Sequence, residues 1–381
     1  MTTTGQQDLA GRLRLTPGAP PPHGLQSSRQ DWAARLGHGV PATSLPGLMA
    51  SLYNLCGHAH HLCSQLAIGA AAPGVLPAPE ATGERLRRET AVEHIRRIGL
   101  DWPRLLSPRQ AQAATAALRE AALPRMLRPG EASDDPWPAL TEWLRHALLQ
   151  MPPAEWLAAW DAQGAAWLAG WCERHEGWLP RLLREARAAD LAVPALEAGQ
   201  ALRPHADAAS LCMLGATLAL KPGFALRPQW NGACAHTGPW TRLRQARAEA
   251  PLSPWVLLGL RLAELVRLCL PGGDTWLGVG ALCTGPRRGL AWVEMARGLL
   301  VHQVEVDPVS ARVLACRVVA PTEWNFHPGG AVAQALAGLP PDAARATGQV
   351  HLLVAAFDPC VPFDIGRLDA LASAARESGH A

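Results

Sequence analysis

The sequence of 381 residues is poor in several residue types. Lys221 is the only lysine, and there are one tyrosine and four phenylalanines. Charged residues make up 18% of the chain and the net charge is +3, a balance that gives no support for binding nucleic acid or an anionic membrane surface. We assign no function to the scarcity of lysine, which is typical of coding bias. The hydrophobic share of 49% is that of a folded globular protein.

Long apolar runs and secretion signals are also missing. The most apolar windows, residues 211–220 and 255–270, are short or interrupted by charged residues, and a membrane-spanning helix needs about 20 apolar residues. No basic segment followed by an apolar run opens the chain. The nine cysteines are odd in number and lack the spacing of a secreted disulfide framework. We therefore expect a cytoplasmic protein whose reduced thiols are core residues or metal ligands.

The densest set of potential metal ligands lies between residues 56 and 63. In a helix, each residue advances by about 100°, which places Cys56, His60 and Cys63 within one narrow arc. His58 and His61 point elsewhere and are expected at the surface. The arc is therefore one candidate metal site, and the alternative for His60 and Cys63 is helix packing or a solvated imidazole.

The remaining pattern predicts a mainly α fold with a small antiparallel β part (α+β), a helical bundle core and one domain over residues 1–381. Tryptophans spaced by four and seven between residues 154 and 188 predict a core stripe, or alternatively the lining of a ligand cavity, with glycines that can bend or divide the helix. A second amphipathic helix is expected from Trp255 to Cys269. Residues 84–99 suit an exposed helix that carries Glu93 and His94 on its face.

Shorter elements are expected at both ends of the chain. Alternating residues favour strands at 9–15, 289–294, 299–307 and 312–319, with a turn at Arg297-Gly298. A helix is expected over about 330–337. The apolar run from His351 to Phe357 is interpreted as a strand that leads into the turn Asp358-Pro359-Cys360.

Five segments, in this order, resemble the large subunit of nickel–iron hydrogenases. Two of them are similar to its cysteine motifs: Cys56-Gly57 resembles the N-terminal Cys-Gly-x-Cys, and Asp358-Pro359-Cys360 resembles the C-terminal Asp-Pro-Cys-x-x-Cys. The other three are similar to its Gly-Pro-Leu-Ala-Arg, Pro-Arg-Gly and Pro-Thr-x-Trp-Asn segments, and they are found here at residues 238–242, 288–289 and 319–325. The resemblance spans nearly the whole chain and is weakest over about 70–200.

The departures from that family bear on function. Its second cysteine in each motif bridges nickel and iron, and here these positions are Ala59 and Phe363. Its N-terminal Glu-Gly-His, whose acid is implicated in proton transfer, corresponds to Ala10-Gly11-Arg12, and the histidine next to its processing site corresponds to Gly366. The resemblance therefore implies that stable binding of two metals and hydrogen turnover are lost.

This pattern resembles the accessory proteins of the HupK/HoxV kind, which serve in maturation of the large subunit. The resemblance implies a non-catalytic scaffold that transiently holds iron carrying cyanide and carbonyl ligands through Cys56 and Cys360. It also places Arg288, with Arg287 as a substitute, and the Pro321-Thr322 segment beside the diatomic ligands. The implied partners are small hydrogenase-assembly chaperones, the iron-loading maturation complex and the apo large subunit.

Two other functions remain open from the sequence. A zinc-binding structural module would use Cys56, His60 and Cys63, although a closed zinc site normally has four ligands. A degenerate hydrogenase with residual turnover is the third possibility.

Overall fold

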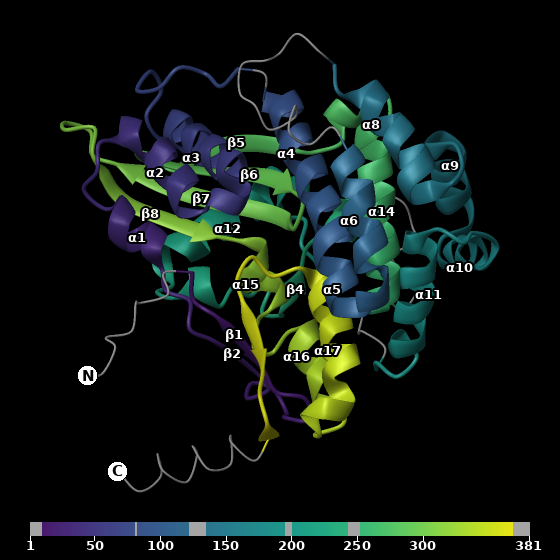
Figure 1. The fold of residues 1–381 in the computed structure, drawn as a ribbon. Coiled ribbons are helices and arrows are strands. Elements are labelled where there is room, and N and C mark those ends of the chain that lie inside the picture. Colours follow the sequence, from purple (N-terminus) through teal and green to yellow (C-terminus); the bar gives the residue numbers. More distant parts are fainter. Residues whose placement is uncertain (1–9, 81, 122–134, 195–199, 243–251, 369–381) are drawn as a thin grey trace, which may run out of the picture.

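A four-stranded antiparallel sheet forms one side of the molecule (Figure 1). The computed structural model describes residues 10–80, 82–121, 135–194, 200–242 and 252–368. In the order in which they pair, the strands are β5 (Val279–Gly285), β6 (Arg288–Met295), β7 (Gly298–Val306) and β8 (Val313–Val319). β6, β7 and β8 confirm the three strands predicted after residue 280, and the turn at Arg297-Gly298 joins β6 to β7. β5 was not predicted.

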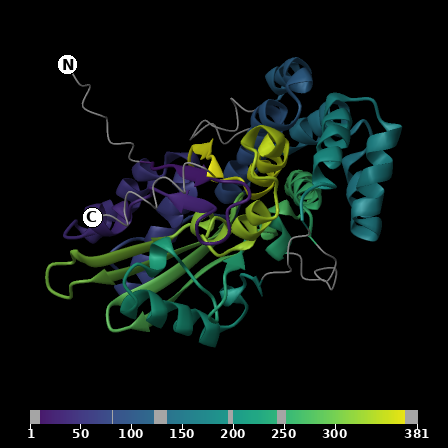
Figure 2. The ribbon, with the colours of Figure 1, turned by 90° about the horizontal axis from the view of Figure 1, so that it is seen from below.

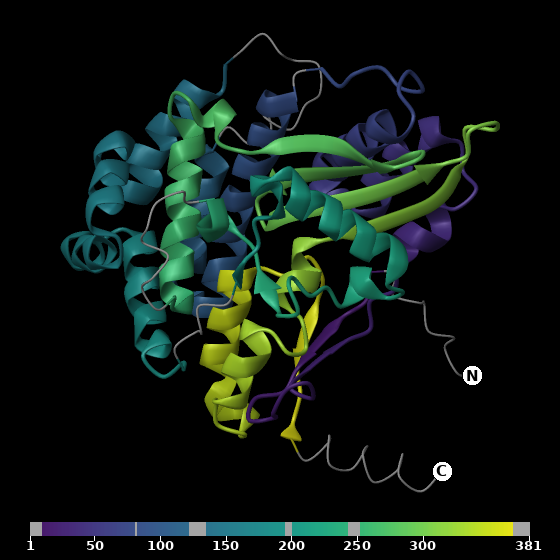
Figure 3. The same cartoon turned by 180° about the vertical axis from the view of Figure 1, so that it is seen from behind.

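Helices cover both faces of this sheet, as Figures 2 and 3 show. α3 (Gly57–Ala71) packs on β6 and β7 from one side. α12 (Ala208–Leu220) lies on the other side, where the Gln303 side chain of β7 donates to the carbonyl of Gly215 at 2.7 Å. With both faces covered, nearly all of β7 is buried, which explains its apolar sequence.

A layer of helices stands beside the sheet around α14 (Pro254–Cys269), which confirms the predicted second amphipathic helix. Ser253 caps α14 by accepting from the Val256 N–H at 3.3 Å. Only two of the helix's 16 residues are not buried, because α14 is packed by other helices on several sides. These neighbours are α4 (Thr82–Arg96), α8 (Trp137–Trp143), α9 (Pro153–Gln163), α10 (Ala165–Arg174), α11 (Trp178–Asp190), α13 (Pro239–Arg242) and α17 (Ala343–Phe357).

The tryptophan-rich segment is divided among three helices, α9, α10 and α11, rather than forming one. Gly164, at φ 58°, separates α9 from α10 in a backbone conformation that favours glycine. Trp156, Trp160 and Trp171 are buried together in the core, with the ring centroids of Trp156 and Trp160 5.8 Å apart. Four of the five tryptophans are buried, which confirms their place in the core, but Trp167 is only partly buried and the five do not share one helix.

The two ends of the chain meet in a small sheet, seen as purple and yellow strands in Figure 1. β1 (Leu13–Leu15) lies between β2 (Leu25–Ser27), which is antiparallel to it, and β9 (Phe363–Ile365), which is parallel to it. Leu13 is opposite Phe363 in this register. The pairing brings the N-terminal segment beside the Asp358-Pro359-Cys360 turn. Leu9, the first residue of the predicted strand 9–15, lies outside the described residues.

Two expectations were wrong. The run His351–Phe357 is the end of the helix α17, capped at its start by Asp342, and not a strand; a short apolar run does not distinguish a strand from a buried helix. The helix over 84–99 exists as α4, but its Glu93 and His94 are buried and not on an exposed face.

The remaining elements are short. α16 (Ala331–Ala337) confirms the predicted helix at 330–337. The others are α1 (Trp32–Gly37), α2 (Leu45–Leu52), α5 (Trp102–Leu106), α6 (Ala111–Glu120), β3 (Gln200–Ala201), β4 (Ala235–His236) and α15 (Pro321–Asn325). Within the described ranges, no helix has both the length and the apolar composition needed to cross a membrane.

Candidate metal centre

Cys56 stands at the start of α3, at the end of a short 3-10 turn, Asn54–Cys56. Just after Cys56, the N–H groups of His58 and Ala59 donate to the Glu89 carboxylate of α4 at 2.8 and 2.9 Å. An acidic group in this place satisfies N–H groups that have no partner inside the helix. Burial raises the pKa of Glu89 to about 7, and burial also raises that of the Cys56 thiol, which is 8% exposed.

Cys360 follows α17 through a turn in which Asp358 has a left-handed conformation, with φ of 50°. The Thr322 hydroxyl of α15 accepts from the Cys360 N–H and donates to its sulfur, both at 3.2 Å. The Arg29 guanidinium, from the segment after β2, donates to the same sulfur at 3.3 Å. Two segments far apart in the sequence therefore donate to this thiol.

Both thiols lie within the electrostatic reach of Arg297, which is 1% exposed. Burial raises the pKa of Cys56, and the Arg297 charge opposes this while a charge on Cys360 adds to it. Burial would lower the pKa of Arg297, but Asp358, Glu93 and the two cysteines together raise it. The charge of Arg297 therefore interacts with the first cysteine of each motif.

A buried ion-pair network supports Arg297. Asp358 pairs with Arg97 at 3.0 Å, Arg261 at 3.3 Å and Arg297 at 3.4 Å, and Glu93 pairs with Arg297 at 2.6 Å. Burial tends to raise the pKa of Asp358, but the three guanidinium groups hold it below its usual value. The Asp-Pro-Cys turn is therefore fixed to the helical layer by charge as well as by packing.

A second buried polar group adjoins this network through His94. Its Nε2 lies 2.7 Å from the Glu264 carboxylate, which also pairs with Arg242. Although burial opposes ionisation, Arg242 and His94 lower the pKa of Glu264 to about 2. Arg242 ends the Gly-Pro-Trp-Thr-Arg segment, and its place here gives that segment a structural role.

His60 and Cys63 do not join Cys56. His60 Nδ1 is 3.0 Å from His302 Nε2 of β7, its ring is stacked on Tyr53 with centroids 4.0 Å apart, and the Cys63 sulfur lies 4.0 Å from the Leu300 carbonyl. Both side chains face the sheet. The expected common arc fails because Cys56 precedes the helix, with φ of −135°. In the described part of the chain, no three His, Cys, Asp or Glu residues are placed to hold a metal ion.

Arg288 is not beside the cysteines. It pairs on β6 with Glu305 of β7 at 2.9 Å, and the two side chains are 29% and 27% exposed. Arg297, followed by Gly298, has the position that was expected of Arg288. The dipeptide Arg-Gly occurs at both 288–289 and 297–298, so the missed residue carried the same signal. Pro321 is the buried first residue of α15 and places Thr322 against Cys360.

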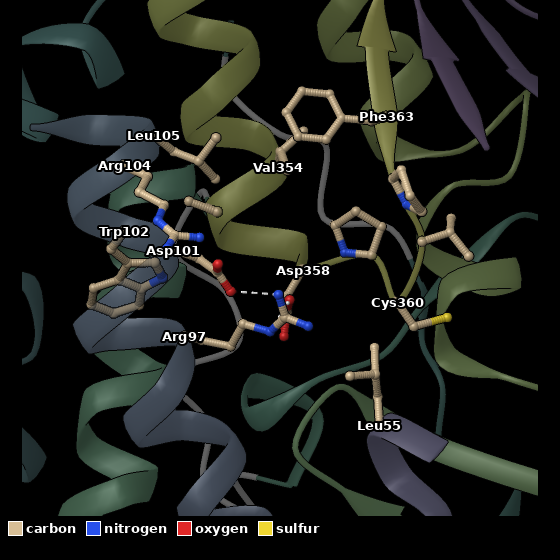
Figure 4. A pocket seen from close by; sticks show the side chains of 14 residues that line it. Leu55, Arg97, Asp101, Trp102, Arg104, Leu105, Val354, Asp358, Cys360 and Phe363 are labelled. Carbon is tan, nitrogen blue, oxygen red and sulfur yellow. Dashed lines mark hydrogen bonds and ion pairs between the residues drawn. The ribbon is translucent and has the colours of Figure 1, made fainter. Parts of the chain in front are cut away.

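A pocket of about 400 Å³ opens beside the Asp358-Pro359-Cys360 turn (Figure 4). Leu55, Leu105 and Phe363 contribute apolar walls, and Arg97 and Arg104 contribute charge. The figure shows the Cys360 sulfur turned away from Arg97, Asp101 and Arg104. The sulfur therefore points toward the Arg29 and Thr322 side of the turn.

The fold is that of the nickel–iron hydrogenase large subunit, and this is the structural class of the chain. Similar solved structures include an NAD+-reducing nickel–iron hydrogenase in the H2-reduced state, with a TM-score of 0.51, 18% identity and coverage of 88% of this chain and 91% of that one. The reduced Ni-Fe-Se hydrogenase from D. vulgaris Hildenborough gives a TM-score of 0.50 at 16% identity, with coverage of 88% of this chain and 92% of that one. At such identities the likeness shows the fold alone.

Curated relatives identify the family within this class. The hydrogenase expression/formation protein HoxV of Cupriavidus necator is 40% identical over 373 residues, which cover 94% of this chain and 95% of that protein. HupK of Rhizobium leguminosarum bv. viciae, also a hydrogenase expression/formation protein, is 30% identical over 360 residues, covering 90% and 91%. No protein-family model matches the chain. The chain belongs to the HoxV/HupK family of hydrogenase expression/formation proteins.

Proposed function

We propose that this protein is a cytoplasmic, non-catalytic scaffold in the maturation of nickel–iron hydrogenase. In this proposal, Cys56 and Cys360 transiently hold iron that carries cyanide and carbonyl ligands and pass it towards the apo large subunit. The observation that carries the proposal is that Arg29 and Thr322 donate to the Cys360 sulfur, while Asp358, two residues before Cys360, is paired with the buried Arg297, whose charge opposes the burial-raised pKa of Cys56. The names of the relatives, hydrogenase expression/formation proteins, support the maturation role.

The number of thiols suits a cargo better than a resident cofactor. Ala59 is fully buried against the core, and Phe363 begins β9, so neither position of the resembled bridging cysteines offers sulfur. Iron with two cyanides and one carbonyl has three sites filled, and two thiolates add two more. One site stays vacant, through which a partner's ligand can take the iron. Thiolates are soft donors suited to such iron, and two bonds release it more readily than four.

The surroundings of the thiols suit an anionic assembly. Two thiolates and two cyanides bring four negative charges to one iron(II), so bound cargo would carry excess negative charge. Arg29, Arg297 and the Thr322 hydroxyl are the donors placed around the two sulfurs. Hydrogen bonds of this kind orient metal ligands and stabilise charge on sulfur and on cyanide nitrogen.

The same proposal includes three kinds of partner: small assembly chaperones, the iron-loading maturation complex and the apo large subunit. The vacant iron site gives a chemical reason for direct contact with each partner in turn. A ligand of the receiving protein must bind the iron before the thiolates of the donating protein release it.

Infrared spectroscopy tests the proposal directly. Protein isolated without oxygen from cells that make the cofactor is expected to show cyanide and carbonyl stretching bands, and Cys56→Ala or Cys360→Ala is expected to remove them. Cys63→Ala is the matched control, because Cys63 is a buried cysteine that faces the sheet. Bands of unchanged intensity in both site variants would refute the ligand assignment. Hydrogen uptake by the isolated chain with an artificial acceptor would refute the non-catalytic role.

A further inference from the structure

A thiol and an imidazole meet outside the candidate metal centre, at Cys234 and His327. Cys234 directly precedes β4 and is partly exposed, and His327 follows α15 by two residues and is 8% exposed. The Cys234 sulfur lies 3.1 Å from His327 Nδ1, and the Gly329 N–H donates to the same nitrogen at 3.0 Å. Nδ1 therefore carries no proton, and the thiol is the donor. A nucleophile, a base and a group that orients the base are thus together.

Buried hydrogen bonds hold the two segments that carry this pair. The Thr237 N–H donates to Asn325 Oδ1 at 2.8 Å, and Asn325 Nδ2 donates to the Thr237 carbonyl at 2.9 Å. Both residues are buried. The turn after α15 is closed by the Gly330 N–H, which donates to the His327 carbonyl at 2.8 Å. The thiol and the imidazole are therefore positioned by the fold on both sides.

The environment makes the reactivity of Cys234 depend on His327. Burial raises the pKa of Cys234, so little thiolate is present at neutral pH, and the thiolate is the nucleophilic form. Burial lowers the pKa of His327, and the charge of Arg227 lowers it further. A neutral imidazole at this distance can accept the thiol proton as the sulfur attacks.

Glycine leaves room beside the sulfur. A Cβ at Gly329 would lie 3.4 Å from the Cys234 sulfur and 3.6 Å from His327 Nδ1. A larger side chain at this position would therefore lie against the reacting pair. Its absence leaves space for a small reagent at the partly exposed thiol.

We propose that Cys234 and His327 form a thiol-modification site that exchanges with low-molecular-weight disulfides of the glutathione kind. The Cys234 sulfur attacks one sulfur of the disulfide while its proton passes to His327 Nδ1, and the disulfide bond breaks. The leaving thiolate then takes this proton from His327. The products are a mixed disulfide on Cys234 and one free thiol, so one disulfide replaces another and no further oxidant or reductant is consumed.

Exchange with glutathione disulfide tests the site on the full chain. The reduced protein is incubated with glutathione disulfide at neutral pH, and the mixed disulfide on each cysteine is followed in time by mass spectrometry. Cys212 and Cys283 are internal references, because both are exposed and the Cys283 sulfur donates to the Gly285 carbonyl, which is not a base. We expect Cys234 to react roughly tenfold faster than either reference, although it is less exposed.

His327→Gln separates base catalysis from simple access. Glutamine can still accept from the Gly329 N–H but takes up no proton, so exchange at Cys234 should slow roughly tenfold. An aromatic disulfide, dithiobis-nitrobenzoate, releases a thiolate that leaves without a proton, and with it the variant should lose only roughly threefold. His351→Gln is the matched control, since this partly buried histidine contacts the Leu105 carbonyl and should leave both rates unchanged.

A second variant guards against failure of His327→Gln to fold. Gly329→Val keeps both reacting side chains and adds methyl groups beside the sulfur, so it should slow exchange at Cys234 several-fold and leave Cys212 unchanged. The modification site would be overturned by a Cys234 rate no higher than that of the references, or by the same rate in wild type and His327→Gln. Identical losses with the two disulfides would overturn the passage of the proton to the leaving thiolate.

Discussion

The short segment of residues 56–63 contributes side chains to two regions of the molecule. One region contains buried ion pairs, and the other contains histidines and a thiol packed against β7. The charge of Arg297, which is paired with Glu93 and Asp358, opposes the rise that burial causes in the pKa of Cys56. His60 and Cys63 face β7, where His60 meets the fully buried His302 and burial lowers the pKa of both histidines. The boundary between the 3-10 turn and α3 separates them. Closeness in sequence therefore did not make one metal site, and the charged surroundings distinguish the thiol suited to anionic cargo.

The uncharged region is maintained by burial. Desolvation lowers the pKa of His302 to about 3. Desolvation is also the largest cause of the lowered pKa of His60, and the neighbouring His302 and Arg29 lower that pKa by less. Burial also raises the pKa of Cys63, where a backbone hydrogen bond opposes the rise, whereas at Cys56 the opposing group is the cation Arg297. The charged region works differently, because each buried cation there has a carboxylate partner.

The largest effect is expected from breaking the charged region. Arg297→Met leaves Glu93 and Asp358 with fewer cations in a buried site, so the free energy of unfolding should fall by about 3–5 kcal/mol. Urea unfolding monitored by tryptophan fluorescence measures it. The matched control is Arg12→Gln, which breaks an exposed pair with Asp364 at 2.8 Å, the two side chains being 49% and 55% exposed. That loss should stay below about 1 kcal/mol. Equal losses in the two variants would contradict the difference drawn between buried and exposed pairs.

The uncharged region should reveal itself through pH. The pKa of His302 is about 3 in the folded protein and that of an unfolded histidine is about 6.5, so the unfolded state binds more protons between these values. Stability should therefore fall as the pH is lowered through this window, by about 1.4 kcal/mol per pH unit for one such histidine. Comparing unfolding at pH 6.5 and pH 5 in wild type and His302→Gln isolates this contribution, which is about 2 kcal/mol. The same pH dependence in both proteins would show that His302 is not held neutral by the fold.

Much of the fold follows from sequence pattern, and the polar site does so only in part. Strands β6 to β8, helix α14 and the Thr322 segment have periodicities or motifs that a short window contains. Arg29 could not be found in this way, because its role depends on β1 pairing with both β2 and β9 across nearly the whole chain. Glu93 and His94 read as an exposed pair, since nothing local shows that arginines of α14 and the β6–β7 turn cover them.

The smallest effect is expected from changing Arg288, and comparing it with a change of Arg297 distinguishes the two Arg-Gly dipeptides. Arg288 pairs with Glu305 across two strands and is partly exposed, so Arg288→Gln should lower the free energy of unfolding by less than about 1 kcal/mol. It should also leave the cyanide and carbonyl bands of loaded protein unchanged in frequency, because no donor near either sulfur is altered. Arg297→Lys keeps a buried cation but loses the planar donor array, and it should shift those bands. A band shift with Arg288→Gln and none with Arg297→Lys would show that Arg288, not Arg297, lies beside the diatomic ligands. It would then support the alignment of Arg288-Gly289 with the family's Pro-Arg-Gly segment.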